Sequence, residues 1–66
     1  MNEYNQRLVA SVAKLFEGQG LTHEELIIAG NEGLLEAEKH YVKNSQFGFT
    51  AYAVWWIRES IITKLK

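Results

Sequence analysis

The stretch FGFTAYAVWWIR, from Phe47 to Arg58, holds most of the aromatic residues of this 66-residue chain. On a helix, with about 100° between successive residues, Ala53 and Ile57 share one face and Tyr52 and Trp55 fall largely opposite. The helix therefore has two apolar faces. A small domain readily buries one of them, and the other favours a partner, a second domain or a ligand with flat apolar surfaces, such as a nucleic-acid base.

Apolar side chains recur at spacings of three and four over residues 2–17, which predicts a first helix there. Gly18 and Gly20 follow this pattern. Glycine just beyond the last apolar residue of a helix readily adopts a left-handed conformation. The sequence therefore predicts that these glycines close the first helix.

A capping box marks the start of a second helix, expected over residues 22–43. Thr22 supplies the capping hydroxyl, and Glu25, three residues later, supplies the reciprocal carboxylate. Gly30 and Gly33 lie inside this helix, and each costs about 1 kcal/mol relative to alanine. This cost predicts that the backbone of a neighbouring element approaches closely at the two glycines.

A third helix is expected over residues 50–65, with Thr50 as its N-cap and with Phe49 and Val54 as a hydrophobic staple. No strand pattern competes with it. The predicted fold is all-α: a single compact three-helix domain over residues 1–66, with the third helix lying across the other two.

The composition of the chain excludes some means of stabilising the domain and some cellular locations. The chain has no cysteine and no proline, so neither disulfides nor a cysteine-based zinc site supplements the apolar core. No apolar run approaches the roughly 18 residues of a membrane span, and the N-terminus lacks the features of a signal peptide. We therefore expect a cytoplasmic protein with no membrane partner.

Charge is divided between the two parts of the chain. Residues 1–38 carry seven acidic and two basic side chains, for a net charge of -5, whereas residues 39–66 carry one acidic and five basic side chains, for +4. Solvated helix faces explain such a pattern. Alternatively, the basic, aromatic part binds a polyanion and the acidic part binds a basic protein.

Catalytic chemistry has little support in the sequence. His23 and His40 lie at opposite ends of the second helix, too far apart to share a metal ion or a catalytic role. No phosphate-binding loop, nucleophile elbow or metal-ligand spacing occurs. The sequence predicts that the protein is not an enzyme and has no catalytic residue, metal site or cofactor.

The aromatic helix offers a different chemistry, because a base that stacks on an exposed ring gains about 1–3 kcal/mol. Tyr52, Trp55 and Trp56 are the candidates, and Arg58 can neutralise a phosphate. In the alternative interpretation, one tryptophan completes the core and the other packs on a neighbouring helix, since tryptophan is usually well covered.

Residues 49–61 resemble the F-S-T/S-Y-A-x-W-W-I-R-Q-A/S-I signature of conserved region 2 in bacterial RNA polymerase sigma factors of the sigma-70 family. Residues 26–34 resemble the family's D-L-I-Q-E-G-N-x-G-L. Residues 5–9, with Ala13 and Lys14, resemble N-L-R-L-V-x-S-x-A-K. The three blocks follow in order without a gap and cover essentially the whole chain.

The resemblance implies a surface that captures the non-template strand of the promoter's minus-ten element. Tyr52 would stack on a base flipped from the duplex, Phe47 would line its pocket, and Trp55 and Trp56 would support the fork. Flipping costs a few kcal/mol, which stacking offsets. The implied DNA-binding residues are Asn5, Leu8, Phe47, Tyr52, Trp55, Trp56, Arg58, Glu59 and Ile62, with Asn5 and Leu8 at the position of a second flipped base.

The resemblance also implies a surface on the second helix for the clamp helices of the largest subunit of the RNA polymerase core. Its residues are Glu25, Ile28, Ala29, Asn31 and Leu35.

Several positions depart from the family pattern. Asn44 and Ser45 replace a basic pair, and Glu59 replaces a glutamine that helps to read the upstream promoter base. Ile28 and Ala29 replace a Q-E pair and are expected to form an apolar patch. The changes on the DNA side are expected to reduce the number of phosphate contacts, and the changes on the second helix are expected to alter the contact with polymerase.

Two interpretations follow. In the first, the chain is a transcription-initiation domain that binds polymerase and promoter DNA. In the second, it is a sigma-like protein-interaction module that has lost DNA binding and uses Ile28, Ala29, Trp55 or Ile62 to bind polymerase, an anti-sigma-type protein or itself. The chain has no room for the helix-turn-helix domain that reads the minus-thirty-five element, so we expect either a fragment of a longer factor or a stand-alone remnant.

Overall fold

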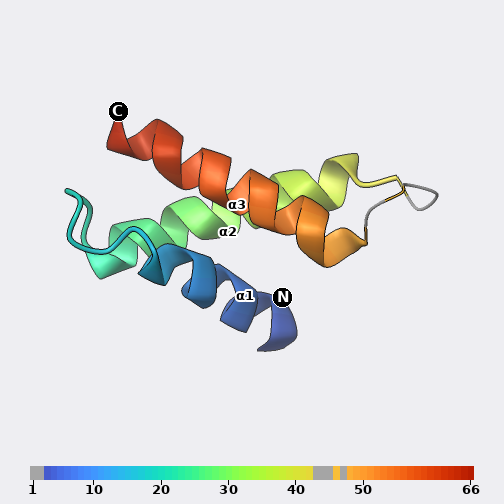
Figure 1. The fold of residues 1–66 in the computed structure, drawn as a ribbon, viewed down its shortest axis with the longest axis horizontal. Coiled ribbons are helices and arrows are strands. Elements are labelled where there is room, and N and C mark those ends of the chain that lie inside the picture. Colours follow the sequence, from blue (N-terminus) through green and yellow to red (C-terminus); the bar gives the residue numbers. More distant parts are fainter. Residues whose placement is uncertain (1–2, 43–45, 47) are drawn as a thin grey trace.

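Three helices form the fold in a computed structural model, which describes residues 3–42, 46 and 48–66: α1 (Glu3–Lys14), α2 (His23–His40) and α3 (Phe49–Leu65). α1 and α3 run in similar directions and α2 runs back the opposite way, so the N-terminal ends of α1 and α3 lie on the same side of the molecule (Figure 1). The most extensive packing is between α2 and α3, which crosses in front of α2 in this view. The predicted all-α, three-helix fold is confirmed.

The capping box predicted for α2 is present. The Glu25 N–H donates to the Thr22 hydroxyl at 3.1 Å, and the Thr22 N–H donates to the Glu25 carboxylate at 2.8 Å. α2 ends at His40, earlier than predicted, because Tyr41 has an extended backbone with ψ 133°. The start of this helix is therefore set by a local motif that is visible in the sequence.

The connection from α1 to α2 begins earlier than predicted. α1 ends at Lys14, and the Leu15 and Phe16 N–H groups donate to carbonyls three residues back, which is a tighter turn than an α-helix. Gly18 and Gly20 have φ angles of 79° and 121°. Both glycines thus have the positive φ that the sequence predicts for them.

The predicted N-cap of α3 is wrong. The helix begins at Phe49, and its N-cap is Gly48, which has no side chain to form a cap hydrogen bond. Thr50 lies inside the first turn, where its hydroxyl shares a hydrogen bond of 2.8 Å with the hydroxyl of Tyr4. The Thr50 hydroxyl therefore forms its hydrogen bond with a residue of another helix and not with the backbone of α3.

The close backbone approach predicted at the glycines of α2 is confirmed at Gly33, whereas the neighbours of Gly30 are side chains. A β-carbon on Gly33 would lie 2.6 Å from the carbonyl oxygen of Trp56 and 2.7 Å from the α-carbon of Ile57, so the backbones of α2 and α3 meet there. A β-carbon on Gly30 would lie 2.7 Å from a methyl carbon of Val9 on α1. The buried apolar core between the helices consists of Val9, Val12, Ala13, Leu26, Ala29, Leu34, Ala37, Ala53, Ile57 and Ile61.

No helix in the described part of the chain has both the length and the apolar character needed to cross a membrane. Within residues 3–42, 46 and 48–66, no group of three histidine or carboxylate side chains is placed to hold a metal ion.

Candidate nucleic-acid interface

An aromatic cluster covers the junction between the end of α2 and the first half of α3. Tyr52 is half-buried at its centre, with ring centroids 5.6 Å from Tyr41 and 6.4 Å from Trp56. Tyr41 in turn meets Phe49 edge-on at 5.3 Å. These rings support one another and restrict the orientations that Tyr52 can adopt. The cluster consists of His40, Tyr41, Phe49, Tyr52, Trp55 and Trp56.

The two adjacent tryptophans have different environments. Trp56 is half-buried, and its ring is stacked on His40 with centroids 5.3 Å apart and planes 11° from parallel. Trp55 is 55% exposed and meets Trp56 edge-on at 5.4 Å. His40 covers one face of Trp56, as expected of a tryptophan that packs on a neighbouring helix. Trp55 is therefore the more accessible ring for a base.

His40, like Tyr41, was not predicted to belong to this cluster. Its Nε2 lies 3.2 Å from a carboxylate oxygen of Glu36, one helical turn earlier. This contact orients the imidazole as it lies over Trp56. The sequence signal was the four-residue spacing of Glu36 and His40, whereas the stack with Trp56 depends on how α2 and α3 pack.

Two cations near the proposed DNA surface already have acidic partners. Lys39 lies 3.8 Å from Glu36, and Lys64 of α3 lies 3.8 Å from Glu32 of α2. Arg58 is exposed and has no ion pair within the described residues. It follows Trp55 by three residues, so the two side chains are neighbours on one helix face. Trp55 and Arg58 together offer a ring for a base and a cation for a phosphate.

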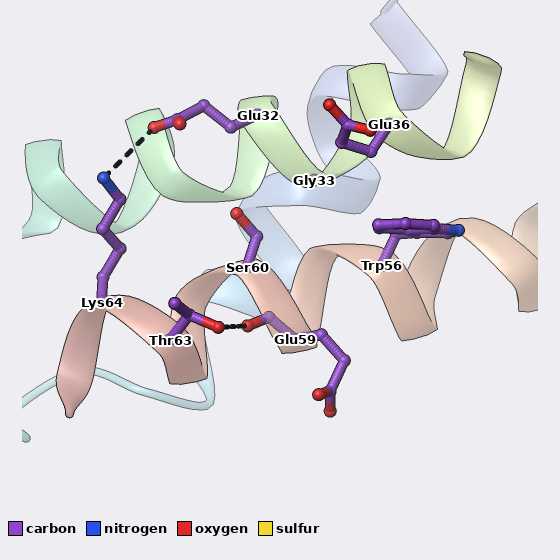
Figure 2. A pocket seen from close by; sticks show the side chains of 8 residues that line it. All are labelled: Glu32, Gly33, Glu36, Trp56, Glu59, Ser60, Thr63 and Lys64. Carbon is purple, nitrogen blue, oxygen red and sulfur yellow. Dashed lines mark hydrogen bonds and ion pairs between the residues drawn. The ribbon is translucent and has the colours of Figure 1, made fainter. Parts of the chain in front are cut away.

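A groove of about 350 Å³ lies between α2 and α3 beside this surface (Figure 2). Glu32 and Glu36 line one side, and Trp56 and Lys64 line the other. The carboxylate of Glu59 points away from α2 in Figure 2, toward the outer side of α3. Glu59 therefore places a negative charge on the solvent side of the aromatic helix.

The other residues proposed to contact DNA differ in accessibility. Asn5 is only 8% exposed and Leu8 is half-buried against the core, so a base contact at Asn5 requires its side chain to move. Ile62 is half-buried on α3. Phe47, with Asn44 and Ser45, lies outside the described residues.

The surface proposed for polymerase lies along the outer side of α2. Ile28 is 60% exposed and Leu35 is 51% exposed, two helical turns apart, with half-buried Asn31 between them. Glu25 is exposed at the start of the helix, where it also forms the capping box. Ala29 is 1% exposed and belongs to the core, so the apolar patch expected from Ile28 and Ala29 is corrected to Ile28 alone.

Known proteins resemble nearly the whole of this chain. The sequence profile of the family "Sigma-70 region 2" matches residues 1–66. The RNA polymerase sigma factors SigA of a Bacillus species, of Listeria monocytogenes and of Listeria innocua are each 46% identical to it over 59 residues. The aligned part is 89% of this chain but only 16% of each relative, so the chain spans a small part of the length of these proteins.

The matched part includes all three helices, so both the aromatic cluster and the outer side of α2 lie within the region that the family shares. By this match over its whole length, the chain belongs to region 2 of the sigma-70 family of bacterial RNA polymerase sigma factors.

Proposed function

We propose that this domain acts in transcription initiation as part of a sigma factor. α3 captures the non-template strand of the minus-ten element during promoter melting, and α2 binds the clamp helices of the RNA polymerase core. The DNA-binding part of this proposal rests on the exposed ring of Trp55, which lies beside Arg58. The other aromatic rings of α3 pack against neighbouring side chains. Membership of the family supports both halves.

Capture of the strand depends on flat rings that are already in place. A flipped base costs a few kcal/mol to extrude, and each base that stacks on a ring regains about 1–3 kcal/mol. Tyr52 and Trp55 together offset that cost. Because Tyr41 and Trp56 hold the Tyr52 ring before DNA arrives, little conformational entropy is lost on binding. Arg58 adds a phosphate contact whose contribution weakens with salt.

Contact with the polymerase depends on apolar side chains that the fold leaves uncovered. Ile28 and Leu35 present aliphatic side chains two turns apart, and Asn31 provides a polar group between them. An interface of this kind has apolar anchors near its centre and polar groups around them. The acidic residues of α2 favour a basic partner surface.

A second candidate function is protein binding without DNA binding, with polymerase, an anti-sigma-type protein or a second copy as partner. Glu59 on the outer side of α3 favours it, because this charge repels a phosphate backbone. The pairing of Lys39 and Lys64 with glutamates also favours it, since these cations are partly neutralised.

Binding of a fluorescent single-stranded minus-ten oligonucleotide, measured by anisotropy at low and moderate salt, separates the two candidates. We expect Tyr52→Ala and Trp55→Ala each to weaken binding by about 5- to 150-fold, the equivalent of one lost stack. Trp55→Phe retains a ring and should lose less. Leu15→Ala, an exposed position in the turn after α1, is the matched control for surface truncation.

If the wild-type domain shows no affinity at low salt, or if both alanine variants bind normally, base stacking is not its function. Such a result would favour the protein-binding candidate.

Capture of the isolated clamp helices on beads, with the domain in solution, tests the α2 surface. We expect Leu35→Ala and Asn31→Ala each to reduce retention by at least about fivefold, since an anchor at the centre of an interface is worth more than 1 kcal/mol. Leu15→Ala again serves as control. Undiminished retention of both α2 variants would place the polymerase contact elsewhere.

A further inference from the structure

A hydrogen bond joins the N-terminal ends of α1 and α3. The hydroxyls of Tyr4 and Thr50 lie 2.8 Å apart although 46 positions separate the two residues in the sequence. Thr50 is free to make this contact because α3 begins before it and does not use its hydroxyl as a cap. Figure 1 shows these two helix ends on the same side of the molecule.

Both residues are next to positions assigned to DNA. Tyr4 directly precedes Asn5, and Thr50 precedes Tyr52 by two residues. α1 packs less extensively on α3 than α2 does, and the Tyr4–Thr50 bond adds a direct side-chain link between α1 and α3 at their N-terminal ends. We propose that Tyr4 and Thr50 form a latch that sets the separation between the base position on α1 and the base position on α3.

This inference rests on the proposed function, and it assigns Tyr4 and Thr50 as positioning residues that do not themselves contact a base. A strand bound at Tyr52 reaches Asn5 and Leu8 as an intramolecular event, and the gain from the second contact depends on the separation of the two positions. The latch therefore affects a strand long enough to reach both positions. A short strand that reaches only Tyr52 does not report on it.

The test compares a long single-stranded oligonucleotide that spans both positions with a short one that covers only the Tyr52 position. We expect Tyr4→Phe and Thr50→Val each to weaken binding of the long strand by about 2- to 10-fold, the range for loss of one hydrogen bond. Binding of the short strand should be unchanged. The double variant should lose no more than either single variant, because both remove the same bond.

Thr63→Val is the matched control for Thr50→Val. Thr63 lies on the same helix, and its hydroxyl donates to the Glu59 carbonyl at 2.9 Å without reaching another helix. We expect this variant to bind both strands as the wild type does. Equal effects of Thr50→Val and Thr63→Val, or an equal loss for the long and the short strand, would overturn the latch.

A second measurement tests the latch without DNA. The chain has no cysteine, so Ala10→Cys and Ala51→Cys, both exposed, place one spin label on α1 and one on α3. We expect Tyr4→Phe to broaden or shift the distance distribution between the labels, and Thr63→Val to leave it unchanged. An unchanged distribution in Tyr4→Phe would overturn the latch. If the wild type binds neither strand, the proposed DNA function fails. The distance distribution then still shows whether the Tyr4–Thr50 bond holds α1 in place relative to α3.

Discussion

At the scale of single residues, Gly33 is the glycine at which an added side chain meets the closest backbone contact. The atoms nearest to its missing side chain belong to the backbone of α3 at Trp56 and Ile57, and backbone atoms cannot rotate away as a side chain can. At Gly30 the nearest atom is a methyl carbon of Val9. The sequence predicted a close backbone approach at both glycines, which is correct at Gly33 and wrong at Gly30, because the cost of a glycine does not reveal which atoms lie against it.

We expect Gly33→Ala to lower the free energy of unfolding by up to about 2 kcal/mol. The forced separation of α2 and α3 costs about 1–3 kcal/mol, and the gain in helix propensity offsets about 1 kcal/mol of this cost. Urea unfolding followed by circular dichroism measures this change. Gly30→Ala should cost less, because Val9 can shift, and a Gly33→Ala protein as stable as the wild type would contradict the backbone contact.

The tryptophan pair shows where prediction from the sequence ends at this scale. Helical periodicity indicated two apolar faces on the third helix but could not choose which tryptophan is covered. The choice depends on His40 of α2, which stacks on Trp56 and leaves Trp55 exposed. A contact between two helices has no signal in the spacing of residues along one of them.

At the scale of elements, the beginnings of α2 and α3 differ in how far the sequence predicts them. The start of α2 depends on Thr22 and Glu25, which are close in sequence, so the capping box was predicted correctly. The start of α3 was misplaced because Thr50 has the ordinary features of an N-cap. Its actual partner is Tyr4, on α1.

Thr22→Ala should lower the free energy of unfolding by about 1 kcal/mol, since a lost N-cap hydroxyl leaves a helical N–H without its partner. Thermal and urea unfolding measure the loss. Thr63→Ala, near the end of α3, should change stability by less than about 0.5 kcal/mol. Equal stability of the Thr22→Ala and wild-type proteins would show that the capping box does not contribute to the stability of α2.

This variant also clarifies the role of Glu25, whose carboxylate both caps α2 and lies on the surface proposed for polymerase. A change at Glu25 alters both features at once. Thr22→Ala weakens the cap alone, so the comparison of Glu25→Ala with Thr22→Ala in the clamp-helix assay isolates the contribution of Glu25 to the interface.

At the scale of the whole molecule, the arrangement of charge limits the proposed DNA function. The sequence predicted an acidic part and a basic part, but the pairing of Lys64 with Glu32 across two helices required the fold. Such exposed pairs contribute little to stability. Their consequence is electrostatic, because they leave Arg58 as the cation beside Trp55, while the exposed Glu59 would repel the phosphates of a bound strand.

We expect Glu59→Gln to tighten binding of the minus-ten oligonucleotide by about 2- to 5-fold at low salt. A like-charge contact at about 4 Å in water costs about 1 kcal/mol, and salt screens it. The gain should therefore shrink as salt increases, which anisotropy titrations at two salt concentrations measure. Glu24→Gln, at the start of α2, makes the same change of charge and should have a smaller effect. Equal gains from both variants would indicate a response to net charge alone.

The backbone contact at Gly33 also determines which parts of the domain can move independently. No side chain of residue 33 separates the backbones of α2 and α3 there, so a displacement of one helix is transmitted directly to the other. α1 packs on this pair through the buried side chains of Val9, Val12 and Ala13, and the exposed hydrogen bond at Tyr4 adds a contact with α3. A partner that displaces α2 at Gly33 therefore displaces α3, and Trp55 with it.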